Sequence, residues 1–193
     1  MALPDEHRLP LKYANRQSGR DPLGSEWNRI LWSQFGAAID MLERALKALP
    51  DARLVDRSQS PEIWYVAYHT LFWLDLYLGG SVEGFMPPEP FGLEELDPTG
   101  LMPESPIDKP ALLSYLAHCR TKCRTTLAAL TDADAGRMCH FSWGTVSFGE
   151  LIIYNMRHVQ DHAAQLNHIL GQTYGEAPDW VGRAHDPLAD ADA

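Results

Sequence analysis

Four stretches of the chain place apolar residues at the three- and four-residue spacing of an α-helix. The first covers residues 25–49 and the third covers residues 108–130, each with one apolar face. The second, residues 60–78, is apolar nearly all round, which is typical of a central helix that is buried on most sides. The fourth covers residues 148–170. The pattern therefore predicts four long helices.

The predicted helix ends are marked by residues with distinct backbone preferences. Ser and Asp side chains accept hydrogen bonds from the free N–H groups of a first turn, and Pro fits the first helical position because it has no N–H to satisfy. Glycine readily adopts the left-handed conformation that closes a helix. The predicted starts are Ser25, Ser60-Pro61, Asp108 and Ser147, the last with Glu150 in a capping box, and the predicted ends are Pro50, Gly79, Thr131 and Gly171.

The segments outside the helices differ in composition. Residues 79–107 are rich in Pro and Gly and predict a long, ordered crossover loop, a kind of segment that is often functional. Residues 141–147 favour a turn or short hairpin around Gly144, residues 1–24 form an N-terminal arm, and residues 172–193 form an irregular acidic tail. We therefore expect an all-α fold, with a four-helix bundle over residues 25–171.

Composition and charge narrow the class of protein. The chain has 193 residues, of which 45% are hydrophobic and 22% charged, as in ordinary soluble globular proteins. Its net charge of −10 argues against nucleic acid or an anionic membrane as a partner. There is no apolar run long enough for a membrane span, no secretory signal pattern, and an odd number of cysteines, three. These features predict a reduced, cytoplasmic protein.

Two histidines stand out in the fourth predicted helix. His158 and His162 are four residues apart, so they lie one turn apart on one face, and both fall within the apolar stripe. Burying two imidazoles is costly unless each nitrogen finds a partner, and one divalent cation can satisfy both. Val159 follows the first histidine, so the pair is not the H-E-x-x-H motif of metalloproteases.

The best candidate for a third ligand is His69, in the middle of the second predicted helix among aromatic residues. Three histidines with open positions are typical of a catalytic metal site. The alternative is that His69 is an ordinary core histidine bonded to a carbonyl or a tyrosine. Asp161 points about 100° away from His162 and is better explained as a solvated carboxylate. Asn155 and Gln165 either support the ligands or line a polar groove.

The cysteines form a competing candidate site. Cys119 and Cys123 are four residues apart, and Cys139 with His140 could join them around zinc. Both helical cysteines, however, fall on an apolar stripe, where cysteine behaves as a small hydrophobic residue. We therefore expect Cys119 and Cys123 to be buried and reduced without a metal. His118 and His168 lie off the stripes of their helices and are expected at the surface.

The order of these motifs resembles a known family. The segment WYVAYHTLFWLD, followed much later by SWGTVSFGELIIYNMRHVQDHAAQLNHILG, is similar to the DinB-like superfamily over residues 25–171. That family overlaps the bacillithiol- and mycothiol-dependent transferases. The resemblance implies an up-down-down-up four-helix bundle, often dimeric, with a divalent metal held by three histidines that map onto His69, His158 and His162. Many members carry a further histidine where this chain has Asp161.

The sequence thus leads to two functional hypotheses. The first is a metal-dependent enzyme that performs thiol S-transfer or metal-assisted hydrolysis on a small molecule, with residues 79–107 covering its pocket. The second is a non-enzymatic, metal-stabilised stress-response or interaction module. In both we expect one divalent ion, which is zinc, nickel or iron with zinc preferred, and a homodimer. The enzyme would take a small-molecule substrate, such as a low-molecular-weight thiol, and neither hypothesis involves nucleic acid or membrane.

Overall fold

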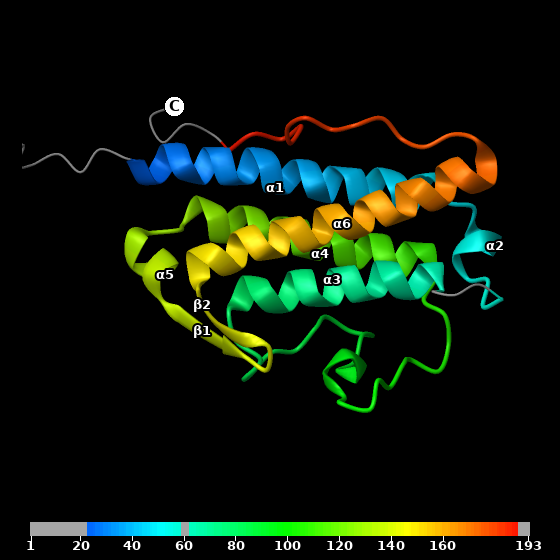
Figure 1. Ribbon diagram of the computed structural model, residues 1–193, viewed down its shortest axis with the longest axis horizontal. Coiled ribbons are helices and arrows are strands. Elements are labelled where there is room, and N and C mark those ends of the chain that lie inside the picture. The colour runs from blue at the N-terminus through cyan, green and yellow to red at the C-terminus, as the bar shows by residue number, and fades with distance from the viewer. Residues whose placement is uncertain (1–22, 59–61, 189–193) are drawn as a thin grey trace, which may run out of the picture.

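Four long helices form the body of the protein. The computed structural model describes residues 23–58 and 62–188. The long helices are α1 (Leu23–Ala48), α3 (Ile63–Gly79), α4 (Lys109–Ala128) and α6 (Phe148–Tyr174), and they lie side by side along the long axis of the molecule (Figure 1). Helices α1 and α3 each pack against both α4 and α6. The predicted all-α fold is confirmed, with one small hairpin added to the helices.

The core lies between these helices and is built from their buried apolar side chains. Trp32 and Phe35 from α1, Phe72 from α3 and Leu116 from α4 are buried there. Helix α3 is buried on most sides, as its all-round apolar pattern predicts. None of the helices in residues 23–58 and 62–188 is long and apolar enough to cross a membrane.

Several helix ends lie away from the predicted residues. Helix α1 begins at Leu23, two residues before Ser25, and the predicted start of α3 at Ser60-Pro61 lies outside the described residues. Gly79 is still helical, and the left-handed residue is Gly80, with φ 75°. Helix α6 likewise continues through Gly171 and closes at Gly175, with φ 75°. A single glycine costs a helix only about 1 kcal/mol, so it need not end one.

Two predicted N-caps are confirmed. The Asp108 carboxylate accepts a hydrogen bond from the backbone N–H of Ala111 at 2.9 Å, at the start of α4. The Ser147 hydroxyl accepts one from the backbone N–H of Glu150 at 3.2 Å, at the start of α6. Each bond satisfies an N–H group that the helix itself leaves free.

The segment between α4 and α6 is more ordered than its sequence suggests. The predicted break at residues 131–136 contains a short helix, α5 (Asp132–Gly136), which begins with a capping box between Thr131 and Asp134. The predicted hairpin is confirmed as the antiparallel strands β1 (Met138–Phe141) and β2 (Gly144–Ser147). A second short helix, α2 (Asp51–Leu54), was not predicted.

The crossover loop runs from residue 80 to residue 108 along the outer side of α3 (Figure 1). Its one regular element is the 3-10 helix η1 (Glu94–Leu96). Phe91 anchors the loop, because its ring stacks on Tyr68 of α3 at 5.9 Å between centroids and on Tyr115 of α4 at 4.4 Å. The predicted ordered loop is thus found, and it lies against the same helix that carries His69.

After α6 the chain turns back and follows α1 without regular structure (Figure 1). The Trp32 indole N–H donates to the carbonyl of Asp186 at 2.7 Å, and the backbone N–H of Ala184 donates to the carbonyl of Ser33 at 2.8 Å. A Cβ on Gly36 would lie 2.6 Å from the Ala184 side chain, so the close approach of this segment to α1 requires glycine there. We call residues 175–188 the C-terminal strap.

Candidate metal centre

The three predicted histidines meet where α3 packs against α6. His69 comes from α3, and His158 and His162 come from successive turns of α6. The Nε2 atoms of His69 and His158 are 3.3 Å apart. One ring nitrogen from each of the three histidines lies within 4.8 Å of those of the other two. The structure therefore brings together residues that are far apart in the sequence.

The packing of α6 on α3 fixes this juxtaposition. Asn155 is buried one turn before His158, and its side-chain amide donates to the Leu74 carbonyl of α3 at 3.0 Å. Val159 and Ala163 are also buried and belong to the core. His158 and His162, the residues just before them in the sequence, are half-buried. The same helix face thus anchors α6 and presents its histidines to His69.

Two of the histidines have a partner on Nδ1. His69 Nδ1 lies 2.7 Å from Oε2 of Glu95, and His162 Nδ1 lies 3.0 Å from Oε1 of Gln165. Both partner oxygens are acceptors, so these contacts favour the tautomer with the proton on Nδ1, in which the lone pair lies on Nε2. His158 differs, because its Nδ1 is buried without a hydrogen-bond partner.

The Glu95 carboxylate was not predicted as part of this site. It comes from η1 in the crossover loop, its side chain is 4% exposed, and Oε2 also accepts from the Trp73 indole at 2.8 Å. Burial works to raise the pKa of Glu95, but its hydrogen bonds outweigh that effect and the net pKa lies below its usual value. Glu95 is therefore ionised near neutral pH. Its only sequence signal is an acidic pair, Glu94-Glu95, within a loop expected to cover the pocket.

The donor set fits a divalent metal ion. Burial, together with the neighbouring His162 and His69, lowers the pKa of His158 to about 3, so this ring is neutral and able to bind metal at neutral pH. Tetrahedral zinc with bonds of about 2.1 Å separates its ligands by about 3.4 Å. The 3.3 Å between the Nε2 atoms of His69 and His158 is close to that spacing. Three half-buried imidazoles leave room on the solvent side for further ligands.

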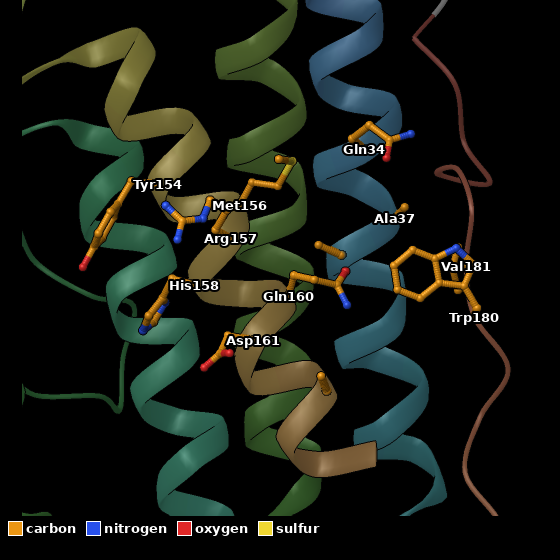
Figure 2. A pocket seen from close by; sticks show the side chains of 12 residues that line it. Gln34, Ala37, Tyr154, Met156, Arg157, His158, Gln160, Asp161, Trp180 and Val181 are labelled. Atoms are coloured by element: carbon orange, nitrogen blue, oxygen red, sulfur yellow. The ribbon is translucent and has the colours of Figure 1, made fainter. Parts of the chain in front are cut away.

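A cavity of about 580 Å³ adjoins the site on the other side of α6. It is formed by α1, α6 and the C-terminal strap, and His158 belongs to its lining (Figure 2). Arg157 and Asp161 are exposed along it, and Trp180 of the strap lies on its far side from His158 (Figure 2). Asp161 is not among the clustered ligand groups, in line with its prediction as a solvated carboxylate.

Aromatic side chains form a wall next to the histidines. Tyr154 lies one turn before His158 on α6 and stacks on Trp143 at the tip of the hairpin, with 4.8 Å between ring centroids. The Trp143 indole donates to the Tyr77 hydroxyl at 3.2 Å. Trp143 and Tyr154 are 44% and 38% exposed, so this wall is open to a ligand as well as to solvent. Sequence patterns did not identify it, because the hairpin is far along the chain from α3, which carries Tyr77.

The remaining candidate ligands lie elsewhere. His118 on α4 is 3.5 Å from the Asp75 carboxylate, and His168 is exposed near the end of α6. A second group of ligand atoms comprises Asp40, Glu43 and His185. The guanidinium of Arg120 already occupies it, at 2.5 Å from Asp40 and 2.8 Å from Glu43, so this group is an ion-pair network.

The cysteines are buried, as predicted for Cys119 and Cys123, and none of the three is in a disulfide. Among the described residues, no group of three or more metal-ligand atoms includes a cysteine. Burial raises the pKa of the Cys119 and Cys123 thiols well above the usual value. These thiols are therefore protonated and shielded.

We expect the native protein to react very slowly with Ellman's reagent, because the thiolate is the reactive form and all three thiols are buried. In denaturant the same reagent should count three thiols per chain. Fast reaction of even one thiol in the native protein would contradict this arrangement.

Comparison with known proteins agrees with the geometry. No curated protein matches the chain. The family model described as the DinB superfamily, however, matches residues 34–166, which cover more than half of the chain and include all three histidines. The chain therefore belongs to the DinB superfamily.

Proposed function

We propose that this protein is a metal-dependent enzyme that binds one divalent cation through His69, His158 and His162 and acts on a small molecule. The observation that carries the proposal is the convergence of three imidazole nitrogens within 4.8 Å on the half-buried surface between α3 and α6. Zinc is the preferred ion, because neutral imidazoles and an open, solvent-facing side suit its catalytic sites.

The arrangement of the helices supports an up-down-down-up four-helix bundle as the frame of this site. Helices α1 and α6 run in one direction along the long axis, and α3 and α4 run in the other (Figure 1). The crossover loop joins the two helices that run in the same direction, α3 and α4, which accounts for its length. In such a frame the ligands come from facing helices and point inward.

The chemistry that we propose is thiol S-transfer or metal-assisted hydrolysis. A bound divalent ion supplies Lewis acidity, which favours the ionised, nucleophilic form of a thiol or a water molecule. The chain holds two ligands in place through Glu95 and Gln165, and the wall of Trp143 and Tyr154 offers apolar contact to a substrate. We infer that the nucleophilic thiol comes from a low-molecular-weight cosubstrate, because the protein's own thiols are buried away from the histidines.

The second hypothesis, a metal-stabilised module without activity, requires a closed site with a fourth protein ligand. Glu95 is the carboxylate nearest to His69 in the described hydrogen bonds, and it contacts Nδ1, on the opposite edge of the ring from Nε2. It is therefore a support for the ligand and not a fourth ligand. We also propose a homodimer in the cytoplasm, as the family resemblance implies.

Metal binding is tested first on protein purified without a metal-affinity step. We expect elemental analysis after zinc reconstitution to give about one ion per chain, because three imidazoles share one partner. At a free zinc concentration of about 100 times Kd, folding stability should rise by about 2.7 kcal/mol, and a chelator should remove that gain. Well under one ion per chain after reconstitution would contradict the proposal.

Access for a thiol is tested on the cobalt-substituted protein. Since no cysteine shares the histidine cluster, its spectrum should lack a thiolate-to-cobalt band until a small thiol such as cysteine is added. Appearance of that band on titration supports an open site that takes a thiol. A spectrum unchanged by small thiols, with stabilisation by metal as the only effect, would favour the non-enzymatic module.

A further inference from the structure

One face of α3 carries three aromatic side chains, two of which hydrogen-bond to a single carboxylate of the crossover loop. Tyr65, His69 and Trp73 follow one another at four-residue intervals and therefore lie on one face over three turns. His69 Nδ1 and the Trp73 indole reach Oε2 of Glu95 at 2.7 and 2.8 Å. Burial raises the pKa of the Tyr65 hydroxyl, and the Glu95 carboxylate raises it further. Glu95 is thus one of the residues that attach the loop to α3, and the one that contacts a proposed metal ligand.

Burying the Glu95 carboxylate costs free energy of desolvation. Its side chain is only 4% exposed, and its Oε1 is buried without a hydrogen-bond partner. Removing a carboxylate from water is unfavourable unless charge or hydrogen bonds compensate. Tyr68 and Phe91 also hold the loop on α3, through a hydroxyl bond to the Gly92 carbonyl at 3.3 Å and a ring stack. Loop attachment alone therefore does not require a buried carboxylate at His69.

The bond between Glu95 and His69 decides which ring nitrogen is free. With the proton held on Nδ1 by the carboxylate, the lone pair of His69 lies on Nε2, which faces Nε2 of His158 at 3.3 Å. A carboxylate on the far nitrogen also makes an imidazole a better metal ligand and fixes the plane of its ring. Without Glu95, the ring of His69 is free to take the other tautomer.

We propose that Glu95 is a positioning residue that holds His69 in its metal-binding tautomer and couples the crossover loop to occupation of the metal centre. This inference rests on the proposed function. Polarisation of the His69 ring at Nε2 strengthens the Nδ1–H bond to Glu95, so a bound cation fastens the loop more tightly. By thermodynamic reciprocity, fastening of the loop strengthens binding of the cation to the same extent.

The test compares zinc affinities, measured by competition with a chelator, for the full chain and three variants. Glu95→Ala should weaken zinc binding about 10- to 100-fold, the usual effect of losing such a partner. Glu95→Gln keeps an acceptor oxygen but loses the charge, so its loss should be smaller. The matched control is Glu94→Gln, since Glu94 neighbours Glu95 in η1 but faces the Tyr68 hydroxyl at 3.4 Å. It should bind zinc like the wild type.

Two further readouts separate positioning from general damage. In zinc-free protein with ¹⁵N-labelled histidine, NMR should show neutral His69 protonated at Nδ1, and this preference should be lost in Glu95→Ala. Zinc should also slow hydrogen exchange of the backbone amides in residues 93–97 of the wild type and of Glu94→Gln, but not of Glu95→Ala. A merely structural role of Glu95 would lower the melting temperature without changing the tautomer.

The experiment separates an error in the positioning role of Glu95 from an error in the proposed metal site. If the wild type takes up no zinc, the proposed function is wrong. If the wild type binds zinc and Glu95→Ala binds it equally well, with unchanged exchange in residues 93–97, the positioning role is wrong. Should Glu95→Ala not fold, Glu95→Gln decides, because an affinity equal to that of Glu94→Gln overturns the inference.

Discussion

Replacing any one of the three clustered histidines by alanine should weaken zinc binding by about 100-fold or more. Structural zinc sites with four ligands contribute about 10–16 kcal/mol in total, so one ligand accounts for about 3 kcal/mol. We expect this loss for His69→Ala, His158→Ala and His162→Ala, because each ring supplies one of the nitrogens that lie within 4.8 Å of one another. Isothermal titration of the metal-free proteins measures it directly.

The same experiment has two control histidines, one on α6 and one on α4. His168→Ala changes an exposed histidine on α6, and His118→Ala changes one on α4 whose contact is Asp75. Both should bind zinc like the wild type. A chelator should lower the melting temperature of the wild type and of these controls, and leave the three ligand variants nearly unchanged. Full zinc affinity in His69→Ala would show that the α6 pair takes its third ligand from elsewhere.

Asp40→Ala should be the most damaging of the substitutions outside the metal centre. Asp40 is fully buried, lies 2.5 Å from the Arg120 guanidinium, and accepts from the backbone N–H of His185 at 3.2 Å. Removing one partner of a buried ion pair leaves the other charge without compensation, which costs about 3–5 kcal/mol. Glu43 also contacts Arg120, so we expect the lower end of that range. Urea unfolding at neutral pH measures the loss.

Asp40→Ala should also release the C-terminal strap. The contact to His185 is one of those that hold the strap on α1, and Arg183 within it is an exposed tryptic site. Trypsin should therefore cleave after Arg183 faster in Asp40→Ala than in the wild type. The control is Asp186→Ala, whose half-exposed carboxylate lies 3.7 Å from Arg120 and should contribute less than about 1 kcal/mol. Equal unfolding free energies for both variants would show that Asp40 is not a strap anchor.

The three ligands were predictable because each breaks a regular pattern. His158 and His162 fall within an apolar stripe, and His69 interrupts a helix that is apolar nearly all round. The structure corrects the predicted burial: Val159 and Ala163 fill the core, and the three histidines are half-buried beside it. A half-buried imidazole still needs partners for its ring nitrogens, and a shared cation can supply one. The long helices were predictable for the same reason, since periodicity reports which face is buried.

Of the supporting residues, Gln165 was predictable, because it lies on the same periodic helix as His162, which it contacts. Glu95 was not predictable, because it comes from a segment without periodicity. Glu95 lies in an aperiodic loop, and only the three-dimensional path of that loop places it beside His69. The sequence likewise does not predict that the C-terminal strap packs on α1, although Gly36 in the middle of α1 lies where the strap approaches. Helix ends were misplaced at Gly79 and Gly171 because one glycine costs less than the hydrogen bonds of a further turn.

The central claim is that one divalent ion is held by three imidazoles and no protein thiolate. X-ray absorption spectroscopy of the zinc-loaded protein tests it most directly, because the spectrum reports the type, number and distance of the atoms bound to zinc. We predict three imidazole nitrogens at about 2.0–2.1 Å, with an oxygen or nitrogen atom of a non-protein ligand completing the shell. A sulfur atom at about 2.3 Å in protein prepared without added thiol, or fewer than three imidazoles, would contradict it.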